Sequence, residues 1–157
     1  MIKFVPFNID DFNAYAKRAT AEYANDKVRA GNWQEETALG QAEEEFQRLL
    51  PNGLQTQDNY LCWIVASEKM SDLKVGVIWY AANPSKKDDI FIWDFEIFDE
   101  FRRKGYATRA LDQLETKSRE IGKKTISLHV FGQNQAARRL YEKCGFEETN
   151  VMMSKKI

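Results

Sequence analysis

Residues 97–111 read IFDEFRRKGYATRAL, and the rest of the chain can be interpreted outward from them. The end of a strand-like run, a short basic loop with Gly105 and an amphipathic helical pattern follow one another here. The first amides of a helix lack internal acceptors and the helix dipole is positive at that end, which favours an anion. Arg102, Arg103 and Lys104 add positive charge, as in a pyrophosphate site. The alternative is an exposed basic helix start in which Gly105 only forms a turn.

The flanking sequence predicts alternating strands and helices. Upstream we expect a strand at 2–7, helices at 10–31 and 32–51, and strands at Tyr60–Ser67, Val75–Ala81 and Ile90–Phe98. Downstream we expect a helix to Gly122, a strand at Thr125–Phe131, a helix at Ala137–Cys144 and a last strand at Glu147–Lys155. The order β-α-α-β-β-β-α-β-α-β indicates an α+β fold with a mixed sheet. The strand runs are apolar at both odd and even positions, which indicates that helices cover both faces of the sheet.

A second informative block is NQAARRLYEKCGF at residues 134–146. It matches the pattern Asn-x-x-Ala-x-x-Leu-Tyr-x-x-x-Gly-Phe of the GCN5-related N-acetyltransferases, the GNAT superfamily. Residues 102–107, RRKGYA, match the signature (Arg/Gln)-x-x-Gly-x-(Gly/Ala) of the same superfamily. Over residues 75–147 the chain therefore resembles this family, and we expect one GNAT-like acetyltransferase domain over residues 1–157, of the small bacterial type. The resemblance implies a mixed, mostly antiparallel central sheet with helices on both faces.

The resemblance also implies acetyl-CoA as the donor and assigns residues to it. Backbone groups of Ile97 and Asp99 would pair with the pantetheine arm like an added strand. Asn134 would contact the arm, and Tyr141 would lie near the thioester sulfur. The segment that would hold the pyrophosphate comprises Arg102, Arg103, Lys104, Gly105, Tyr106, Ala107 and Thr108.

Acetyl transfer to an amine needs a neutral nucleophile, a polarised thioester carbonyl and a proton for the departing thiolate. Members of the family usually transfer the acetyl group directly, within a ternary complex. Tyr141 is a candidate proton donor, because its phenol is a hydrogen-bond donor with a pKa near 10. The alternative is a core aromatic residue, because Tyr141 shares a helical stripe with Ala137, Leu140 and Cys144.

The candidate base lies on the strand at 90–98. Strict alternation would place Phe91, Trp93, Phe95 and Ile97 on one face, and Ile92, Asp94 and Glu96 on the other. Burial of a carboxylate is costly unless it is paired, and it raises the pKa toward a range useful to a base. Asp94 is the first candidate and Glu96 the second. The alternatives are a structural hydrogen bond from Asp94 and a proton path through water.

Composition limits the classes of function. The 157 residues are 43% hydrophobic and carry 23 Lys and Arg against 24 Asp and Glu, so we expect neither disorder nor a nucleic-acid partner. Runs of about 18 apolar residues, as a membrane span needs, do not occur. With two distant cysteines, Cys62 and Cys144, and one histidine, we expect no metal and a cytoplasmic location.

We therefore predict an N-acetyltransferase that uses acetyl-CoA and a primary amine, preferably on a small molecule, as a monomer or homodimer. A protein N-terminus or lysine is the second candidate acceptor. A non-catalytic acyl-CoA-binding protein is the candidate from another class. Nothing in the sequence identifies the acceptor itself.

Overall fold

The computed structural model describes residues 1–68, 71–155 and 157. Five strands and four α-helices are found in this part of the chain, with 3₁₀ turns η1 (Gly53–Gln55) and η2 (Asp99–Phe101). The strands are β1 (Ile2–Pro6), β2 (Asn59–Ser67), β3 (Asp72–Ala82), β4 (Asp89–Ile97) and β5 (Thr125–Leu128). The helices are α1 (Ile9–Arg29), α2 (Glu35–Leu49), α3 (Tyr106–Glu120) and α4 (Gln135–Lys143).

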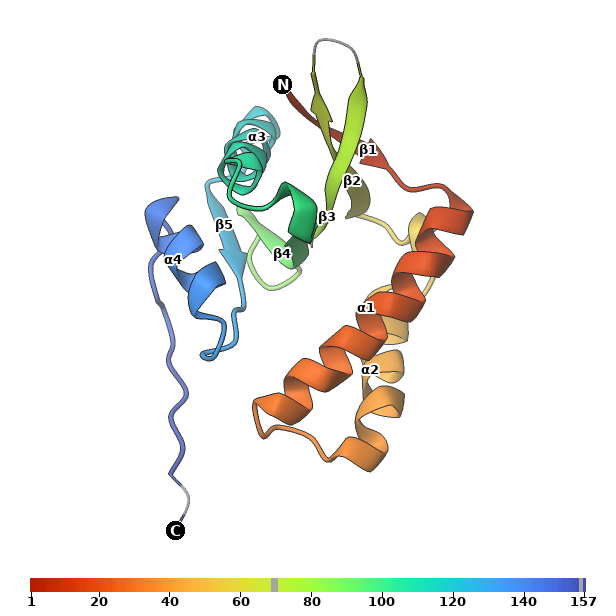
Figure 1. Cartoon of the computed structure of the whole chain (residues 1–157), viewed down its shortest axis with the longest axis vertical. Helices are drawn as coiled ribbons and strands as arrows, with labels where there is room; N and C mark the ends of the chain where they lie inside the picture. The colour runs from red at the N-terminus through yellow and green to blue at the C-terminus, as the bar shows by residue number, and fades with distance from the viewer. Residues whose placement is uncertain (69–70, 156) are drawn as a thin grey trace.

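The strands form one mixed sheet in the order β1-β2-β3-β4-β5. Neighbours from β1 to β4 are antiparallel, whereas β5 runs parallel to β4 after the α3 crossover. Because β4 has a neighbour on each side, its carboxyl end lies in the middle of the molecule, beside the start of α3 (Figure 1). The predicted fold class, α+β with a mostly antiparallel mixed sheet, is confirmed.

Helices cover both faces of the sheet, as the apolar strand runs predict (Figure 1). On one face, Tyr15 of α1 and Leu50 after α2 pack with Val77 and Trp79 of β3. On the other, the core of α3 packs against β2, β3 and β4, and α4 adds partly buried residues to it. Among the described residues, no helix combines the length and apolarity needed to cross a bilayer.

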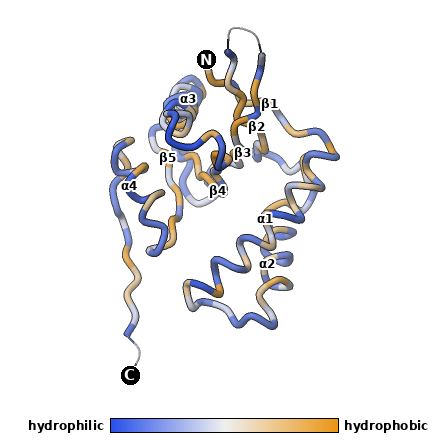
Figure 2. Tube along the Cα trace, viewed as in Figure 1, coloured by the Kyte–Doolittle hydropathy of each residue, from blue (hydrophilic) through white to orange (hydrophobic). Residues whose placement is uncertain are grey.

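The order of elements matches the prediction as far as α4, but the last predicted strand is wrong. Residues Glu147–Lys155 are extended and belong to no ladder of the described chain. They leave the body of the molecule below α4 (Figure 1), and their apolar stretch is visible in Figure 2. A strand pattern shows that a segment can pair, but a strand forms only where a neighbour supplies hydrogen bonds.

The predicted faces of β4 are partly wrong because the strand is irregular. Trp79 pairs with Asp94 while its neighbour Tyr80 pairs with Ile92, so Trp93 is an extra residue, a β-bulge. Before the bulge the alternation is therefore shifted: Ile92 joins the core on the α3 face, and Phe91 lies on the other face against Trp93. Asp94 and Glu96 share a face, as predicted.

Candidate active site

The loop between β4 and α3 has an unusual backbone. Gly105 has φ 77° and Arg103 has φ 59°, both in the left-handed region. Gly105 is the N-cap of α3, and a Cβ built on it would meet no atom within 4 Å. Glycine is favoured there for its backbone conformation, and the space on its Cβ side is open to a ligand.

Six consecutive amides, from Arg103 to Thr108, donate to no acceptor among the described residues. The first helical hydrogen bond of α3 is the one from Arg109 N to Gly105 O, at 3.2 Å. No side chain of the described chain caps this helix start. Unpaired amides at the positive end of a 15-residue helix have the polarity that an anion needs.

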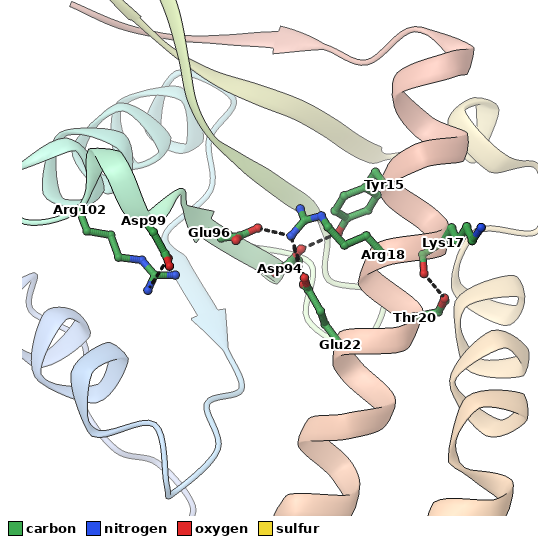
Figure 3. Close-up of polar contacts among 9 residues, drawn as sticks. All are labelled: Tyr15, Lys17, Arg18, Thr20, Glu22, Asp94, Glu96, Asp99 and Arg102. Carbon is green, nitrogen blue, oxygen red and sulfur yellow. Dashed lines mark hydrogen bonds and ion pairs between the residues drawn. The ribbon is translucent and has the colours of Figure 1, made fainter.

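Two basic side chains of this loop donate hydrogen bonds to backbone carbonyls that precede them. Arg102 donates from Nε to Ile97 O at 2.9 Å and forms an ion pair with Asp99 at 2.8 Å (Figure 3). Lys104 Nζ donates to Glu100 O at 2.8 Å. Their charge stays beside the free amides while their hydrogen bonds hold the loop in place.

Two other predicted residues of this segment are held elsewhere by their own contacts. The Tyr106 side chain is buried, and its hydroxyl donates to Glu68 Oε1 at 2.7 Å, so its backbone amide remains the group available to a ligand. Asp99 lies beyond β4, in the turn η2, where its carbonyl accepts from Arg102 N. Ala107 and Thr108 lie in the first turn of α3, half-buried.

β4 and β5 separate beside this loop. Their parallel pairing covers only Asp89–Ile92 with Thr125–Leu128, and it stops where the bulge at Trp93 begins. The Phe98 amide donates to Val75 O in β3, so alternation turns the backbone groups of Ile97 and Phe95 toward the gap. The second half of β4 thus presents a backbone edge that no strand of the described chain pairs with, although Arg102 already donates to Ile97 O on it.

The start of the β4–β5 pair is fixed by a buried carboxylate. Asp89 is fully buried and accepts hydrogen bonds from Thr125 Oγ1 at 2.5 Å, Ser127 Oγ at 2.8 Å and Asn83 Nδ2 at 2.7 Å. These donors outweigh the effect of burial, and the pKa of Asp89 is lowered. Sequence reasoning did not single out Asp89, which anchors the two strands before they separate.

Both candidate carboxylates, Asp94 and Glu96, lie on the face of β4 that α1 covers, and side chains of α1 contact them. Tyr15 donates its hydroxyl to Asp94 Oδ2 at 2.7 Å (Figure 3). Arg18, one turn further along α1, contacts Glu96 Oε2 at 2.6 Å and also pairs with Glu22 at 3.1 Å. The sequence predicts Tyr15 only as part of an apolar stripe; no pattern in it indicates that the hydroxyl reaches a strand 79 positions away.

The environment of Asp94 raises its pKa. Burial is the main cause, and the negative charge of Glu96 acts in the same direction. The Tyr15 hydrogen bond and the Arg18 charge oppose this effect. Burial together with the negative charge of Asp94 also raises the pKa of Tyr15 well above its ordinary value, so Tyr15 is the donor of the pair.

The second motif supplies Asn134 and Tyr141. Asn134 is the N-cap of α4, where its Oδ1 accepts from Ala137 N at 3.1 Å. Tyr141 is partly buried against the core and packs edge-to-face on Phe146, with 5.5 Å between ring centroids. Burial, and then the negative charge of Asp94, raises the pKa of Tyr141 to about 12. The phenol therefore keeps its proton at neutral pH and can donate it.

The model of the acetyltransferase (GNAT) family matches residues 26–146. The chain belongs to the GNAT family. It is also 41% identical over 157 residues to the Bacillus subtilis (strain 168) N-acetyltransferase YycN, with 99% of each chain covered. The crystal structure of YycN superposes with a TM-score of 0.91 at 40% identity, covering 100% of this chain and 99% of that one.

A second Bacillus relative agrees with this assignment, and a more distant structure shares the fold. The Bacillus subtilis N-acetyltransferase YdgE is 30% identical over 149 residues, covering 94% of this chain and 93% of YdgE. An acetyltransferase from Pyrococcus furiosus shares the fold, with a TM-score of 0.65 at 20% identity and complete coverage of both chains. The protein is therefore a GNAT N-acetyltransferase, from a family that generally uses acetyl-CoA.

Proposed function

We propose that this GNAT protein transfers an acetyl group from acetyl-CoA directly to a primary amine of a small molecule. The observation that carries the donor assignment is the run of six unpaired amides from Arg103 to Thr108. A pyrophosphate needs several donors on a concave, positively polarised backbone, and the open side of Gly105 allows it to approach. In this proposal an extended pantetheine arm pairs with the β4 edge at Phe95 and Ile97, with which no strand of the described chain pairs.

The acceptor side of the proposal rests on Asp94. An amine is protonated at neutral pH and must lose a proton before it can attack the thioester. A partly buried carboxylate with a raised pKa, on a central strand beside the gap between β4 and β5, suits that step. Tyr15 orients Asp94, whose Oδ1 accepts no hydrogen bond from the described residues and is left for the acceptor or for water.

Tyr141 completes the proposed set as the proton donor to the departing thiolate. In this proposal Tyr141 acts as the acid and Asp94 as the base, and the negative charge of Asp94 adds to the effect of burial in raising the pKa of Tyr141. The proposed site thus has a base, an acid and a set of backbone amides that binds the donor, which are the parts that direct transfer in a ternary complex needs.

The donor assignment is tested by Gly105→Glu, with Gly122→Glu as a matched control. Both glycines have positive φ, 77° and 75°, and a Cβ at either position meets no atom within 4 Å. They flank the two ends of α3, so strain and charge are similar while only Gly105 adjoins the free amides. Calorimetry should show loss of coenzyme A binding in Gly105→Glu and near wild-type affinity in Gly122→Glu. Equal affinities in the two folded variants would exclude the pyrophosphate assignment.

A further inference from the structure

Trp93, the bulged residue of β4, is partly exposed although it adjoins aromatic residues of the core. Its exposed fraction is 39%, whereas Trp79, whose ring lies 5.8 Å away between centroids, is exposed to only 5%. Trp79 belongs to the core on the α1 side, where its Nε1 donates to Asn59 Oδ1 at 2.8 Å. One part of the Trp93 side chain therefore packs on a fixed aromatic ring, and the rest is open.

Other aromatic side chains extend this surface toward β5. Phe91 is half-buried and packs on Trp93, with 4.6 Å between ring centroids. The ring of Phe131, after β5, lies 5.3 Å from that of His129 and 6.4 Å from that of Tyr23 in α1. A single exposed aromatic residue would carry little weight, but a group of them marks a surface that binds an apolar ligand.

This aromatic surface adjoins both residues to which proton transfer is assigned above. Phe91, His129 and Phe131 line one open hollow of about 1360 Å³, and Tyr141 lines the same hollow. Asp94 directly follows Trp93 in β4. An acceptor whose amine lies at Asp94 can therefore place its remaining atoms against Trp93 and Phe91.

The charges around Asp94 favour a cation. Arg18 pairs with Glu96 at 2.6 Å and with Glu22 at 3.1 Å, so three carboxylates adjoin one guanidinium (Figure 3). Their combined charge is negative, which attracts the ammonium form of an amine.

The other end of the aromatic surface is positively charged. Lys27 lines the hollow, and its Nζ lies 5.3 Å from the centroid of the Tyr23 ring and 5.1 Å from that of Trp33. Tyr23 also contacts Phe131, so this ammonium lies at the Phe131 end of the surface. It would repel a second ammonium on the acceptor but not a neutral ring. The charges therefore favour an amine with one apolar group over a polyamine.

We propose that the acceptor is a primary amine joined by a short chain to an aromatic ring, and that Trp93 is the residue that selects it. The assignment of this acceptor class rests on the acetyl transfer proposed above. The ring packs against Trp93 and Phe91 while the amine lies at Asp94. Aromatic rings attract one another in offset and edge-to-face arrangements, so a planar ring gains more from Trp93 than a saturated ring of similar size.

The first test compares phenethylamine with cyclohexylethylamine, which have the same linker and the same number of carbon atoms. Thiol release from acetyl-CoA should give a kcat/KM about 2- to 10-fold higher for the aromatic amine with the wild type. Trp93→Phe keeps an aromatic ring and should retain the preference. Trp93→Leu should lose it, mainly through a higher KM for phenethylamine. Diaminobutane should be a poorer acceptor than either.

Tyr60→Leu is the matched control. Tyr60 is also a partly exposed aromatic residue of the sheet, with an exposed fraction of 45%, and it stacks at 5.0 Å on Tyr80 of the α3-side core. Its variant should keep the wild-type preference, and circular dichroism checks that all variants fold. Thiol release without a preference for the aromatic amine would overturn the proposal, as would a preference that persists in Trp93→Leu or is equally lost in Tyr60→Leu.

The second test measures binding without turnover. Phenethylamine is added to the protein in the presence of coenzyme A, which has no acetyl group to transfer, and saturation-transfer NMR records its contact with the protein. Transfer to the ring protons should be strong with the wild type and Trp93→Phe and absent with Trp93→Leu. That result supports the aromatic surface even if no amine causes thiol release, in which case the proposed acetyl transfer alone fails. Equal transfer with the wild type and Trp93→Leu would overturn the role of Trp93, whether or not thiol is released.

Discussion

The surroundings of Asp94 depend on a single extra residue in β4, the bulge at Trp93. With strict alternation along β4, Ile92 and Asp94 would share a face. The bulge at Trp93 instead moves Ile92 into the α3-side core and leaves Asp94 facing α1, where Tyr15 donates to it at 2.7 Å. The bulge also ends the pairing with β5, so one residue positions the carboxylate and opens the gap beside it.

The pair of Tyr15 and Asp94 predicts a change in pH dependence. The Tyr15 hydrogen bond lowers the pKa of Asp94, against the raising effect of burial. Tyr15→Phe removes that bond, so the pKa of Asp94 rises further and the base loses its charge at a higher pH. The acidic limb of kcat/KM should therefore move to higher pH in Tyr15→Phe.

Asp94→Asn is the companion variant. It keeps the size of the side chain and removes the titrating group, so turnover should fall strongly and the acidic limb assigned to Asp94 should vanish. A purely structural Asp94 predicts a lower melting temperature with the pH–rate profile unchanged in both variants. That outcome would exclude Asp94 as the general base.

Tyr141→Phe tests the proposed acid. The ring stays packed on Phe146 and only the hydroxyl is lost, so the fold should be retained. Positioned proton transfer contributes roughly 10²–10⁴-fold, and kcat should fall by that factor while acetyl-CoA affinity stays near wild type. The loss should shrink with an aryl thioester, whose thiolate leaves without a proton. Wild-type turnover in this variant would assign Tyr141 to the core alone.

At the scale of elements, the site depends on how closely β3 approaches β4. A Cβ on Gly76 would lie 2.0 Å from Glu96 O and 3.1 Å from Ile97 Cα, and both are backbone atoms. Only glycine allows this approach. It fixes the position of the strand end from which the loop to α3 begins.

Gly76→Ala should therefore push β4 outward and destabilise the protein by about 1–3 kcal/mol, as overpacking does. It should also weaken coenzyme A binding, because the displaced strand leads directly into the loop. Gly40→Ala is the control: Gly40 lies inside α2 with no atom within 4 Å of an added Cβ, and alanine there should stabilise the helix by about 0.5–1 kcal/mol. Thermal unfolding measures both effects. Equal melting temperatures for the two variants would contradict the account of Gly76.

For the whole molecule, the sequence predicts local features well and long-range partners poorly. The loop at 97–111 and the block at 134–146 predict the family, because the glycines, basic residues and helix pattern of each motif lie close together in the sequence. The contacts of Tyr15 with Asp94 and of Arg18 with Glu96 join residues about 78 positions apart, and no periodicity encodes them. The segment Glu147–Lys155 has a strand pattern, but whether it pairs depends on which edge is free.

The central claim is that the six unpaired amides, Asp94 and Tyr141 together serve acetyl transfer from acetyl-CoA to an amine. The most direct measurement is thiol release from acetyl-CoA by the wild-type protein against a broad panel of amines. Thiol release should depend on both the protein and a particular amine, and Asp94→Asn should suppress it. Tight acetyl-CoA binding without consumption by any amine of the panel would contradict the claim and indicate a protein that binds acyl-CoA without turning it over.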